Sequence, residues 1–504
     1  MNSGSAASRT GDAAVGLGGP GAALPVSLDL VAGRRQVPGL LLDGTLDDPN
    51  TGTPLAARRA SAPDVVEQAL ATAHSTHLDR TWADAGVEGR AEVLLRLADE
   101  LEARGRAMAV TESLNTGIVI GVTTPMAAGF AHHVRELVEE LRTAGTVREL
   151  PGRGPGRVLL RRDPWGPAVV VGPWNTSLPT AIGKSVAALA AGCPVILKPS
   201  EWAPSTSTLF ADAVQAAGLP DGVFQLVHGD GRVGAQLVGD PRVRAIAMTG
   251  GTVAGRAVAA SAAANFTRLQ LELAGNNPAI IRADADLART AAALASGMTK
   301  LNGQWCEGPG RVFVPSALHD ELIEALLAEL ARVRIGPSTE PSSQMGPIAY
   351  RRHLELLTDQ VSGAVELGAR ALIPEVSLPA EGWFMAPTVL TDLEPGHAEA
   401  EIFGPVVSVH RVSGDAEALA LANQTTDGLA GFVFGADVEQ ALALGAHLRG
   451  GEIRVNGTSL LDLTDASHQS FWGTSGYGGH GAGEALEFFR GNRIVGVDNP
   501  DAPI

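Results

Sequence analysis

Along residues 60–460, apolar residues form two patterns that alternate, one typical of strands and one typical of helices. Short apolar runs, each closed by Gly, Pro or a polar residue, are typical of strands buried on both faces. Between these runs lie segments whose apolar residues recur at helical spacing with charged residues between them, as in 87–105. Strands that alternate with helices in this way predict an α/β fold with parallel sheets.

The predicted elements follow from this alternation. Strands are expected at 167–172, 193–197, 244–248, 269–273, 278–281, 311–314, 406–410, 431–434 and 452–455. Helices are expected at 87–105, 181–191, 288–301, 317–331, 351–367 and 438–448. No repeat of solenoid length is present, and 504 residues exceed what one hydrophobic core accommodates, so two or three domains are expected.

The segment 150–162 does not fit the alternation. Its Gly and Pro residues predict a turn, and residues 158–162 predict a strand that leaves the main body. Such a strand often pairs with another subunit or with an edge strand. A plain surface loop is the alternative interpretation.

Composition narrows the classes of partner. The chain has 38 basic and 55 acidic residues, a net charge of −17, which argues against nucleic acid or an anionic membrane as partner. No apolar run approaches the roughly 18 residues of a membrane helix. Residues 1–24, rich in Gly, Ala and Ser, are expected to form a flexible tail rather than a signal peptide. Two cysteines cannot make a disulfide framework, so a reducing, cytoplasmic location is expected.

Cys306 and Glu272 are the first candidates for chemistry. Cys306 stands among Gly303, Gly308 and Gly310, outside any apolar run, whereas Cys193 lies in an apolar run and is interpreted as a buried small hydrophobe. Glu272 ends an apolar strand. A thiol attacks carbonyl carbon, and a carboxylate can take a proton from water in a later step.

Other polar residues follow the predicted strands. Lys198 and Glu201 come after a strand and can bind the hydroxyls of one ribose; a surface ion pair is the alternative. A carboxylate there would repel a 2′-phosphate, which favours NAD over NADP. Asn175 offers an amide donor for an oxyanion, although an Asn after Trp is more often a turn residue. The Gly-rich loops 229–234 and 249–255 open helices and can attract phosphate, and Glu401 lies in a Gly-Pro turn.

Together these motifs resemble the aldehyde dehydrogenase superfamily over about residues 40–495. The resemblance rests on Pro-Trp-Asn at 173–175, Lys-Pro-Ser-Glu at 198–201, Leu-Glu-Leu at 271–273, Gly-Gln-Trp-Cys at 303–306 and Glu-Ile-Phe-Gly-Pro at 401–405, in that order. It implies that Cys306 forms a thiohemiacetal and then a thioester, that Asn175 holds the oxyanion, and that Glu272 activates water. It also implies oxidation of a small-molecule aldehyde to the carboxylic acid, with NAD as cofactor and no metal.

The resemblance also implies a cofactor site and a domain plan. The cofactor residues are Trp174, Lys198, Ser200, Glu201, Gly231, Gly234, Thr249, Gly250, Gly251, Leu273, Glu401 and Phe403. A Rossmann-like NAD-binding domain is expected at 25–146 and 163–272, and a catalytic α/β domain at 273–467. A small β oligomerisation element is expected at 147–162 and 486–504, with a homodimer or homotetramer as the assembly.

Several positions depart from the family pattern. Gly251 stands where a serine is usual, Trp305 stands where smaller residues are common, and an atypical Gly-rich run reaches to Gly483. Two alternatives therefore stay open. One is a CoA-acylating relative, against which Glu272 argues because those relatives usually lack this base. The other is a degenerate member that binds nucleotide without catalysis.

Overall fold

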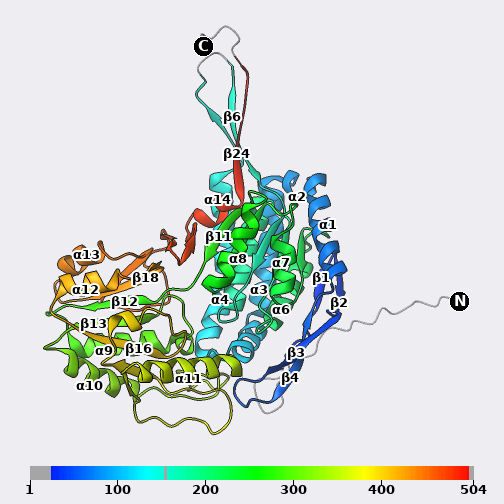
Figure 1. The fold of residues 1–504 in the computed structure, drawn as a ribbon. Helices are drawn as coiled ribbons and strands as arrows, with labels where there is room; N and C mark the ends of the chain where they lie inside the picture. Colours follow the sequence, from blue (N-terminus) through cyan, green and yellow to red (C-terminus); the bar gives the residue numbers. More distant parts are fainter. Residues whose placement is uncertain (1–23, 153–155, 499–504) are drawn as a thin grey trace.

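Two sheets, each covered by helices on both faces, form the body of the computed structural model, which describes residues 24–152 and 156–498 (Figure 1). The predicted α/β class is confirmed. The expected flexible tail falls almost wholly on residues outside the described part of the chain. Within the two described ranges, no helix is both long and apolar enough to cross a membrane.

The first sheet has eight strands in the order β2-β1-β9-β8-β7-β10-β11-β22. Its five central strands run parallel, and β1, β2 and β22 pair antiparallel at the edges. The strands are β1 Asp29–Val31, β2 Arg34–Gln36, β7 Ala168–Val171, β8 Val195–Lys198, β9 Phe224–Leu226, β10 Ala245–Thr249, β11 Arg268–Glu272 and β22 Gly476–Tyr477.

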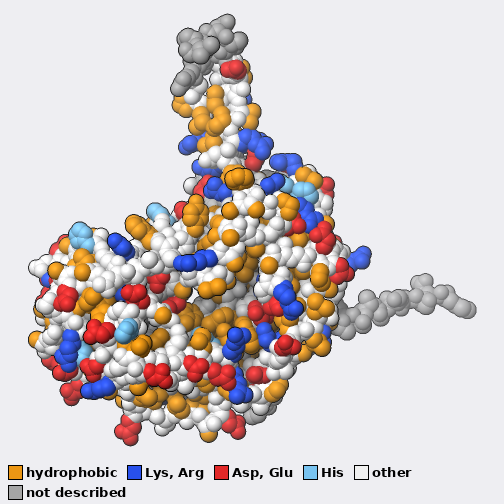
Figure 2. Space-filling view, in the orientation of Figure 1, with side chains coloured by type: hydrophobic (Ala, Val, Ile, Leu, Met, Phe, Trp, Pro, Cys, Tyr) orange, Lys and Arg blue, Asp and Glu red, His pale blue; other side chains and the backbone are white. Residues whose placement is uncertain are grey.

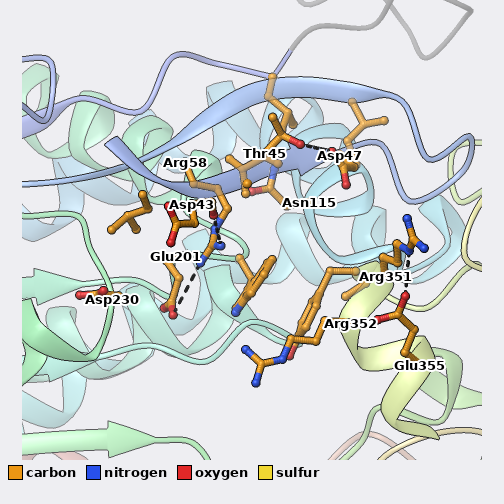
Figure 3. Close-up of a pocket in the computed structure, with 18 of the residues that line it drawn as sticks. Asp43, Thr45, Asp47, Arg58, Asn115, Glu201, Asp230, Arg351, Arg352 and Glu355 are labelled. Carbon is orange, nitrogen blue, oxygen red and sulfur yellow. Dashed lines mark hydrogen bonds and ion pairs between the residues drawn. The ribbon is translucent and has the colours of Figure 1, made fainter. Parts of the chain in front are cut away.

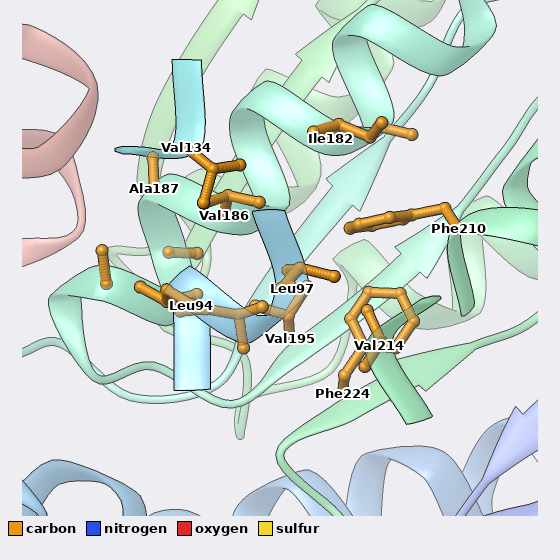
Figure 4. Packing of buried hydrophobic residues seen from close by; sticks show 14 of the residues in the cluster. Leu94, Leu97, Val134, Ile182, Val186, Ala187, Val195, Phe210, Val214 and Phe224 are labelled. Atoms are coloured by element: carbon orange, nitrogen blue, oxygen red, sulfur yellow. The ribbon is translucent and has the colours of Figure 1, made fainter. Parts of the chain in front are cut away.

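Helices cover both faces of this sheet. In β7, Ala168 and Val170 face one helical layer and Val169 the other, as the two-residue period of a strand requires. Figure 4 shows the larger layer, where Leu94, Leu97, Ile182, Val186 and Phe210 interlock with Val195 and Phe224. The helices are α1 Pro63–Asp79, α2 Thr81–Asp84, α3 Gly86–Thr116, α4 Ile120–Ala144, α5 Ser177–Ala191, α6 Ser205–Ala216, α7 Gly231–Val238, α8 Thr252–Ala263 and α14 Glu484–Phe488.

The second sheet has seven strands in the order β14-β15-β16-β13-β12-β18-β19, all parallel except the pair β14–β15. Helices α9 and α10 pack on one face, and α12 and α13 on the other. The elements are β12 Asn277–Ile281, α9 Leu287–Thr299, β13 Pro309–Pro315, α10 His319–Leu330, α11 Arg351–Glu366, β14 Arg370–Leu372, β15 Thr388–Thr391, β16 Val406–Val412, α12 Asp415–Ala422, β18 Ala430–Phe434, α13 Val438–Gly445 and β19 Glu452–Val455.

A three-stranded antiparallel sheet projects from the body at the top of Figure 1. It contains β5 Val147–Leu150, β6 Val158–Pro164 and β24 Arg490–Gly496 in the order β24-β6-β5. The expected strand at 158–162 is therefore confirmed. The range 486–504, expected to belong wholly to this element, divides in the structure: Leu486 and Phe489 lie in the core of the first sheet, and the projecting strand starts at Arg490.

Three antiparallel pairs complete the described strands: β3 Leu40–Asp47 with β4 Pro54–Ala60, β17 Asp427–Gly428 with β21 Trp472–Gly473, and β20 His468–Ser470 with β23 Gly479–Gly481. After the second sheet the chain thus returns to the first. There β22 pairs with β11, with Gly476 opposite Glu272.

Several predicted helix ends differ from the structure: the helix expected at 181–191 begins at Ser177, the helix expected at 438–448 ends at Gly445, and two further differences have a structural cause. The helix expected at 87–105 continues as α3 to Thr116, because Gly105 is accommodated where α3 passes close to the backbone of Ala127, and the helix stops only at Gly117, which has φ 77°. The helix expected at 288–301 ends at Thr299, since Leu301 has φ 50°.

Candidate active site

A cavity of about 740 Å³ opens at the carboxyl ends of the parallel strands of the first sheet and reaches the loops of the second. Ligand sites in α/β sheets typically occupy this position. All fifteen residues singled out in the sequence line it: Cys306, Glu272, Asn175, Trp174, Lys198, Ser200, Glu201, Gly231, Gly234, Thr249, Gly250, Gly251, Leu273, Glu401 and Phe403. The folded chain therefore places residues more than two hundred positions apart around one space.

The loop before Cys306 has an uncommon backbone. Leu301, Asn302 and Gly303 have φ of 50°, 59° and 74°, a left-handed run that costs free energy for residues other than glycine. The Asn302 amide stabilises it by donating to the carbonyls of Gly117 and Pro347, both at 2.8 Å. A Cβ at Gly303 would lie 2.1 Å from the nitrogen of Pro405, so this glycine lets the loop pack against the Glu401–Pro405 turn.

Cys306 is partly buried, and its Sγ lies 4.0 Å from Glu272 Oε1, with the thiol donating. Burial raises the pKa of the thiol well above its ordinary value, and the charges of Glu272 and Glu307 raise it further. The thiol is thus neutral at rest and has a carboxylate within reach of its proton. The Asn277 amide fixes the turn by donating to the carbonyls of Cys306 and Gly308, at 2.8 and 2.9 Å.

Asn175 is buried beside this loop. Its side-chain nitrogen donates to the Gln304 carbonyl at 2.9 Å. This bond holds the Asn175 side chain against the backbone two residues before Cys306. An amide nitrogen carries two protons, so a second donor is left for a bound ligand.

Glu272 lies among three polar groups. Its Oε2 is 3.2 Å from Thr249 Oγ1, 3.6 Å from Lys184 Nζ and 3.7 Å from His480 Nδ1. Burial alone would raise the pKa of Glu272. The hydrogen bond and charge of His480, the charge of Lys184 and the Thr249 hydroxyl outweigh it and lower the pKa to about 2. Glu272 is therefore a carboxylate throughout the physiological pH range.

Neither Lys184 nor His480 was identified from the sequence. Lys184 lies on α5 in an apolar helix without a motif of its own, and its contact with Glu272 arises only when α5 packs beside β11. His480 lies in the atypical Gly-rich run, which was the one signal that could have drawn attention to it.

The far end of the cavity holds Lys198 and Glu201. Lys198 Nζ lies 3.9 Å from Glu201 Oε2 and donates to the Pro199 carbonyl at 3.1 Å. Arg58 approaches the other oxygen of Glu201 at 4.0 Å and stacks over the Trp202 ring at 3.7 Å. Glu201 also borders a second cavity of about 620 Å³, into which Figure 3 shows Arg58 and Glu201 pointing.

Aromatic residues close the third side. Trp174 makes edge-to-face contacts with Tyr350, His353 and Phe403, with ring centroids 5.2, 4.7 and 5.4 Å apart. Glu401 accepts a hydrogen bond from the Gly275 amide at 3.4 Å. Burial raises the pKa of Glu401 to about 8, with the Gly275 amide acting in the opposite direction. The cavity therefore has a thiol and a carboxylate at one end and the Lys198–Glu201 ion pair at the other.

Trp305 forms part of an apolar cluster on the other side of the nucleophile. Its ring is buried with Ile118 and Leu301, and this cluster packs against Val122, Cys306 and Leu460. The residue that departs from the family pattern thus contributes an apolar wall beside the thiol.

Comparison with known proteins identifies the family. A model described as the aldehyde dehydrogenase family matches residues 45–495. The geranial dehydrogenase of Castellaniella defragrans is 34% identical over 399 residues, which cover 78% of this chain and 83% of that protein. A betaine aldehyde dehydrogenase of Mesorhizobium japonicum is 34% identical over 422 residues, which cover 82% of this chain and 86% of that protein.

Solved structures give the same result. An aldehyde dehydrogenase C mutant of Pseudomonas syringae, determined with NAD⁺ and octanal, superposes with a TM-score of 0.87 at 27% identity, over 93% of this chain and 96% of that one. The family match spans the whole second sheet, the first sheet except its edge strands β1 and β2, and every residue that lines the cavity. The chain therefore belongs to the aldehyde dehydrogenase family, whose members are oxidoreductases that act on aldehydes.

Proposed function

We propose that the protein oxidises an aldehyde to the carboxylic acid with NAD, through a thioester on Cys306 that Glu272-activated water hydrolyses. The observation that carries the proposal is the 4.0 Å approach of Cys306 Sγ to Glu272 Oε1, at the wall of the cavity that also contains Lys198 and Glu201. At this separation a small side-chain movement brings the thiol proton within hydrogen-bond reach of the carboxylate.

The residues fit a dinucleotide. A Cβ at Gly231 or Gly251 would meet no atom within 4 Å, so both backbones face open cavity, and the twelve-residue helix α8 begins at Thr252. Amides at such a helix start favour phosphate. Lys198 and Glu201 would hold the adenosine ribose, and Glu401 the nicotinamide ribose, with Phe403 packed beside it. The bound nicotinamide supplies a hydride acceptor.

The residues of this chain supply the remaining chemistry. Glu272 takes the thiol proton, and Cys306 attacks the carbonyl carbon to form a thiohemiacetal. The free N–H of Asn175 and the Cys306 backbone amide hold the oxyanion. Loss of hydride leaves a thioester on Cys306. Glu272 releases the thiol proton to solvent and then takes a proton from water, the water oxygen bonds to the acyl carbon, and the carbon–sulfur bond breaks to release the acid and leave Cys306 as the thiolate.

NADH formation with a panel of aldehydes tests this function. Geranial, betaine aldehyde and octanal represent terpenoid, cationic and linear substrates. We expect NADH and the free acid with at least one aldehyde of a broader panel, and we expect added CoA to leave the product unchanged. Acyl-CoA as the sole product, or no turnover by folded protein that binds NAD, would contradict the proposal.

Glu201 is expected to set the choice between NAD and NADP. Its carboxylate would repel a 2′-phosphate, while Lys198, Arg58 and the 620 Å³ cavity beside it supply cations and room for one. Removing a like-charge contact at a partly exposed site is worth about 1.4 to 2.8 kcal/mol, so Glu201→Gln should shift the NADP/NAD ratio of kcat/KM toward NADP by roughly 10- to 100-fold. Glu355→Gln is the control, because Glu355 lines the same second cavity but pairs with Arg351 at 2.8 Å (Figure 3). An unchanged ratio in Glu201→Gln would exclude this role.

The projecting sheet is the proposed oligomerisation element for a homodimer or homotetramer. Ile494 and Val497 are 59% and 67% exposed, Val147 and Val495 are also exposed, and Figure 2 shows hydrophobic side chains along this projection. Such apolar surface on a sheet with a free edge favours a partner.

Ile494→Asp combined with Val147→Asp should therefore reduce the assembly to monomers in light scattering after size exclusion. Phe266→Asp is the matched control, since Phe266 is equally apolar and 94% exposed on the body. Wild-type protein that is already monomeric at micromolar concentration would overturn the assignment of this element.

A further inference from the structure

His480 contacts Glu272, but the mechanism above does not use it. It lies on β23, with Nδ1 3.7 Å from Glu272 Oε2 and Nε2 3.1 Å from Gln469 Oε1, and its ring meets Phe471 edge-on at 5.2 Å. The side chain is about 31% exposed, so it can exchange protons with solvent. It therefore connects the base of the site to water.

The Gly-rich run brings His480 to this position. A Cβ at Gly476 would lie 1.8 Å from the Leu271 carbonyl oxygen, and one at Gly479 would lie 2.3 Å from that of Gln469. A Cβ at Gly481, which has φ 105°, would lie 2.2 Å from the Ser467 oxygen. The run can follow β11 and β20 this closely only as glycine. His480 is the only residue larger than Ala between 478 and 483.

Neighbouring hydrogen bonds fix the tautomer of His480. Gln469 donates through Nε2 to the Leu429 carbonyl at 2.7 Å, which turns its Oε1 toward His480. His480 Nε2 must then carry a proton and donate it. In neutral imidazole the other nitrogen, Nδ1, has no proton, so its lone pair faces the Glu272 carboxylate. Nδ1 is therefore either a protonated partner of Glu272 or a vacant proton acceptor beside it.

The charges around His480 decide which form prevails at neutral pH. Glu272 faces it from β11, Glu307 from the turn after Cys306, and Lys184 from α5. Burial would lower the pKa of His480. The hydrogen bond and charge of Glu272, with the charge of Glu307, outweigh burial and the opposing charge of Lys184, and the pKa rises above its ordinary value. His480 is thus protonated at low pH and loses the Nδ1 proton as pH rises through the raised pKa.

We propose that His480 is a positioning residue for Glu272 that receives, at Nδ1, the proton Glu272 takes from water. The proposal rests on the proposed function, because it concerns hydrolysis of the Cys306 thioester. Water oxygen bonds to the acyl carbon, one water proton passes to Glu272 and on to Nδ1, and the carbon–sulfur bond breaks to leave a thiolate. Nδ1 then releases the proton to solvent. When Nδ1 is already protonated, it cannot accept the water proton from Glu272, and Glu272 stays paired with the His480 cation.

Ester hydrolysis measured against pH tests this role. p-Nitrophenyl acetate acylates a thiol without hydride transfer, so the burst of nitrophenol reports acylation and the steady state reports hydrolysis. We expect the wild-type steady-state rate to rise with pH as His480 loses its Nδ1 proton, which gives the pH profile an ascending limb. In His480→Asn the burst should persist, but the limb should vanish and the rate at pH 9 should fall at least about tenfold.

Two further variants complete the design. His468→Asn changes an exposed histidine of the same two-stranded sheet, without contact to Glu272, and should keep the limb. In His480→Ala, added imidazole should restore the high-pH rate, which a purely structural role would not allow. The same limb and plateau in His480→Asn as in wild type, or no rescue by imidazole, would overturn the proposal. A wild-type burst that survives Cys306→Ala would instead overturn the proposed function.

Discussion

Cys306→Ala is expected to abolish aldehyde oxidation, with kcat/KM falling by at least about 10⁴-fold. No other thiol can replace it in the described structure. Cys193 is fully buried behind α5, donates to the Phe489 carbonyl at 3.4 Å, and has its pKa raised by burial to about 12. NADH formation at 340 nm with the best aldehyde of the panel measures the loss.

Cys193→Ala is the control for this result. It removes the only other sulfhydryl, outside the cavity, and should keep the activity per folded molecule. NAD binding should also persist in Cys306→Ala, because Lys198 and Glu201 lie at the opposite end of the cavity. Undiminished turnover by Cys306→Ala would refute covalent catalysis through this sulfur.

Glu272→Gln is expected to separate the two halves of the reaction. Steady-state oxidation should fall by about 10²- to 10⁴-fold, the usual contribution of a general base. Acylation should be slowed less than hydrolysis, because Glu272→Gln removes the base for the thiol proton but also removes the negative charge that raises the pKa of Cys306. The expected trace is a burst of NADH approaching one equivalent per site, followed by a slow phase.

Glu355→Gln should show neither the burst nor the slow phase, since Glu355 lies outside the cavity that contains Cys306. Equal slowing of the first turnover and of later ones in Glu272→Gln would mean that Glu272 acts only before the thioester forms and not in its hydrolysis. Unchanged steady-state turnover would remove it from the mechanism altogether.

The sequence was sufficient for nine strands of the two large sheets and for the residues around the cavity, whereas β1, β2, β9, β14, β15 and β22 were not predicted. Strands such as 431–434 are apolar and buried on both faces, and such a short apolar run between turn residues predicts a strand. The residues that line the cavity could be predicted because they stand at or after strand ends, as Lys198 and Glu272 do. Their order along the chain also matches a family.

Features that depend on close packing could not be predicted from the sequence. Gly105 looks like a helix stop, yet it lies inside α3, where another helix approaches its backbone. Leu301 was predicted as the last residue of a helix, but it has a left-handed conformation in the loop where Gly303 packs against Pro405. His480 is a lone histidine among glycines until β23 brings it to Glu272. Each depends on a neighbour distant in sequence.

Mass spectrometry of Glu272→Gln after one turnover tests the central claim most directly. Protein mixed with NAD and a turned-over aldehyde should gain the mass of one acyl group, and peptide mapping should place it on Cys306. NADH and adduct should appear in equal amounts. NADH without an adduct, or an adduct on another residue, would contradict a Cys306 thioester that waits for Glu272.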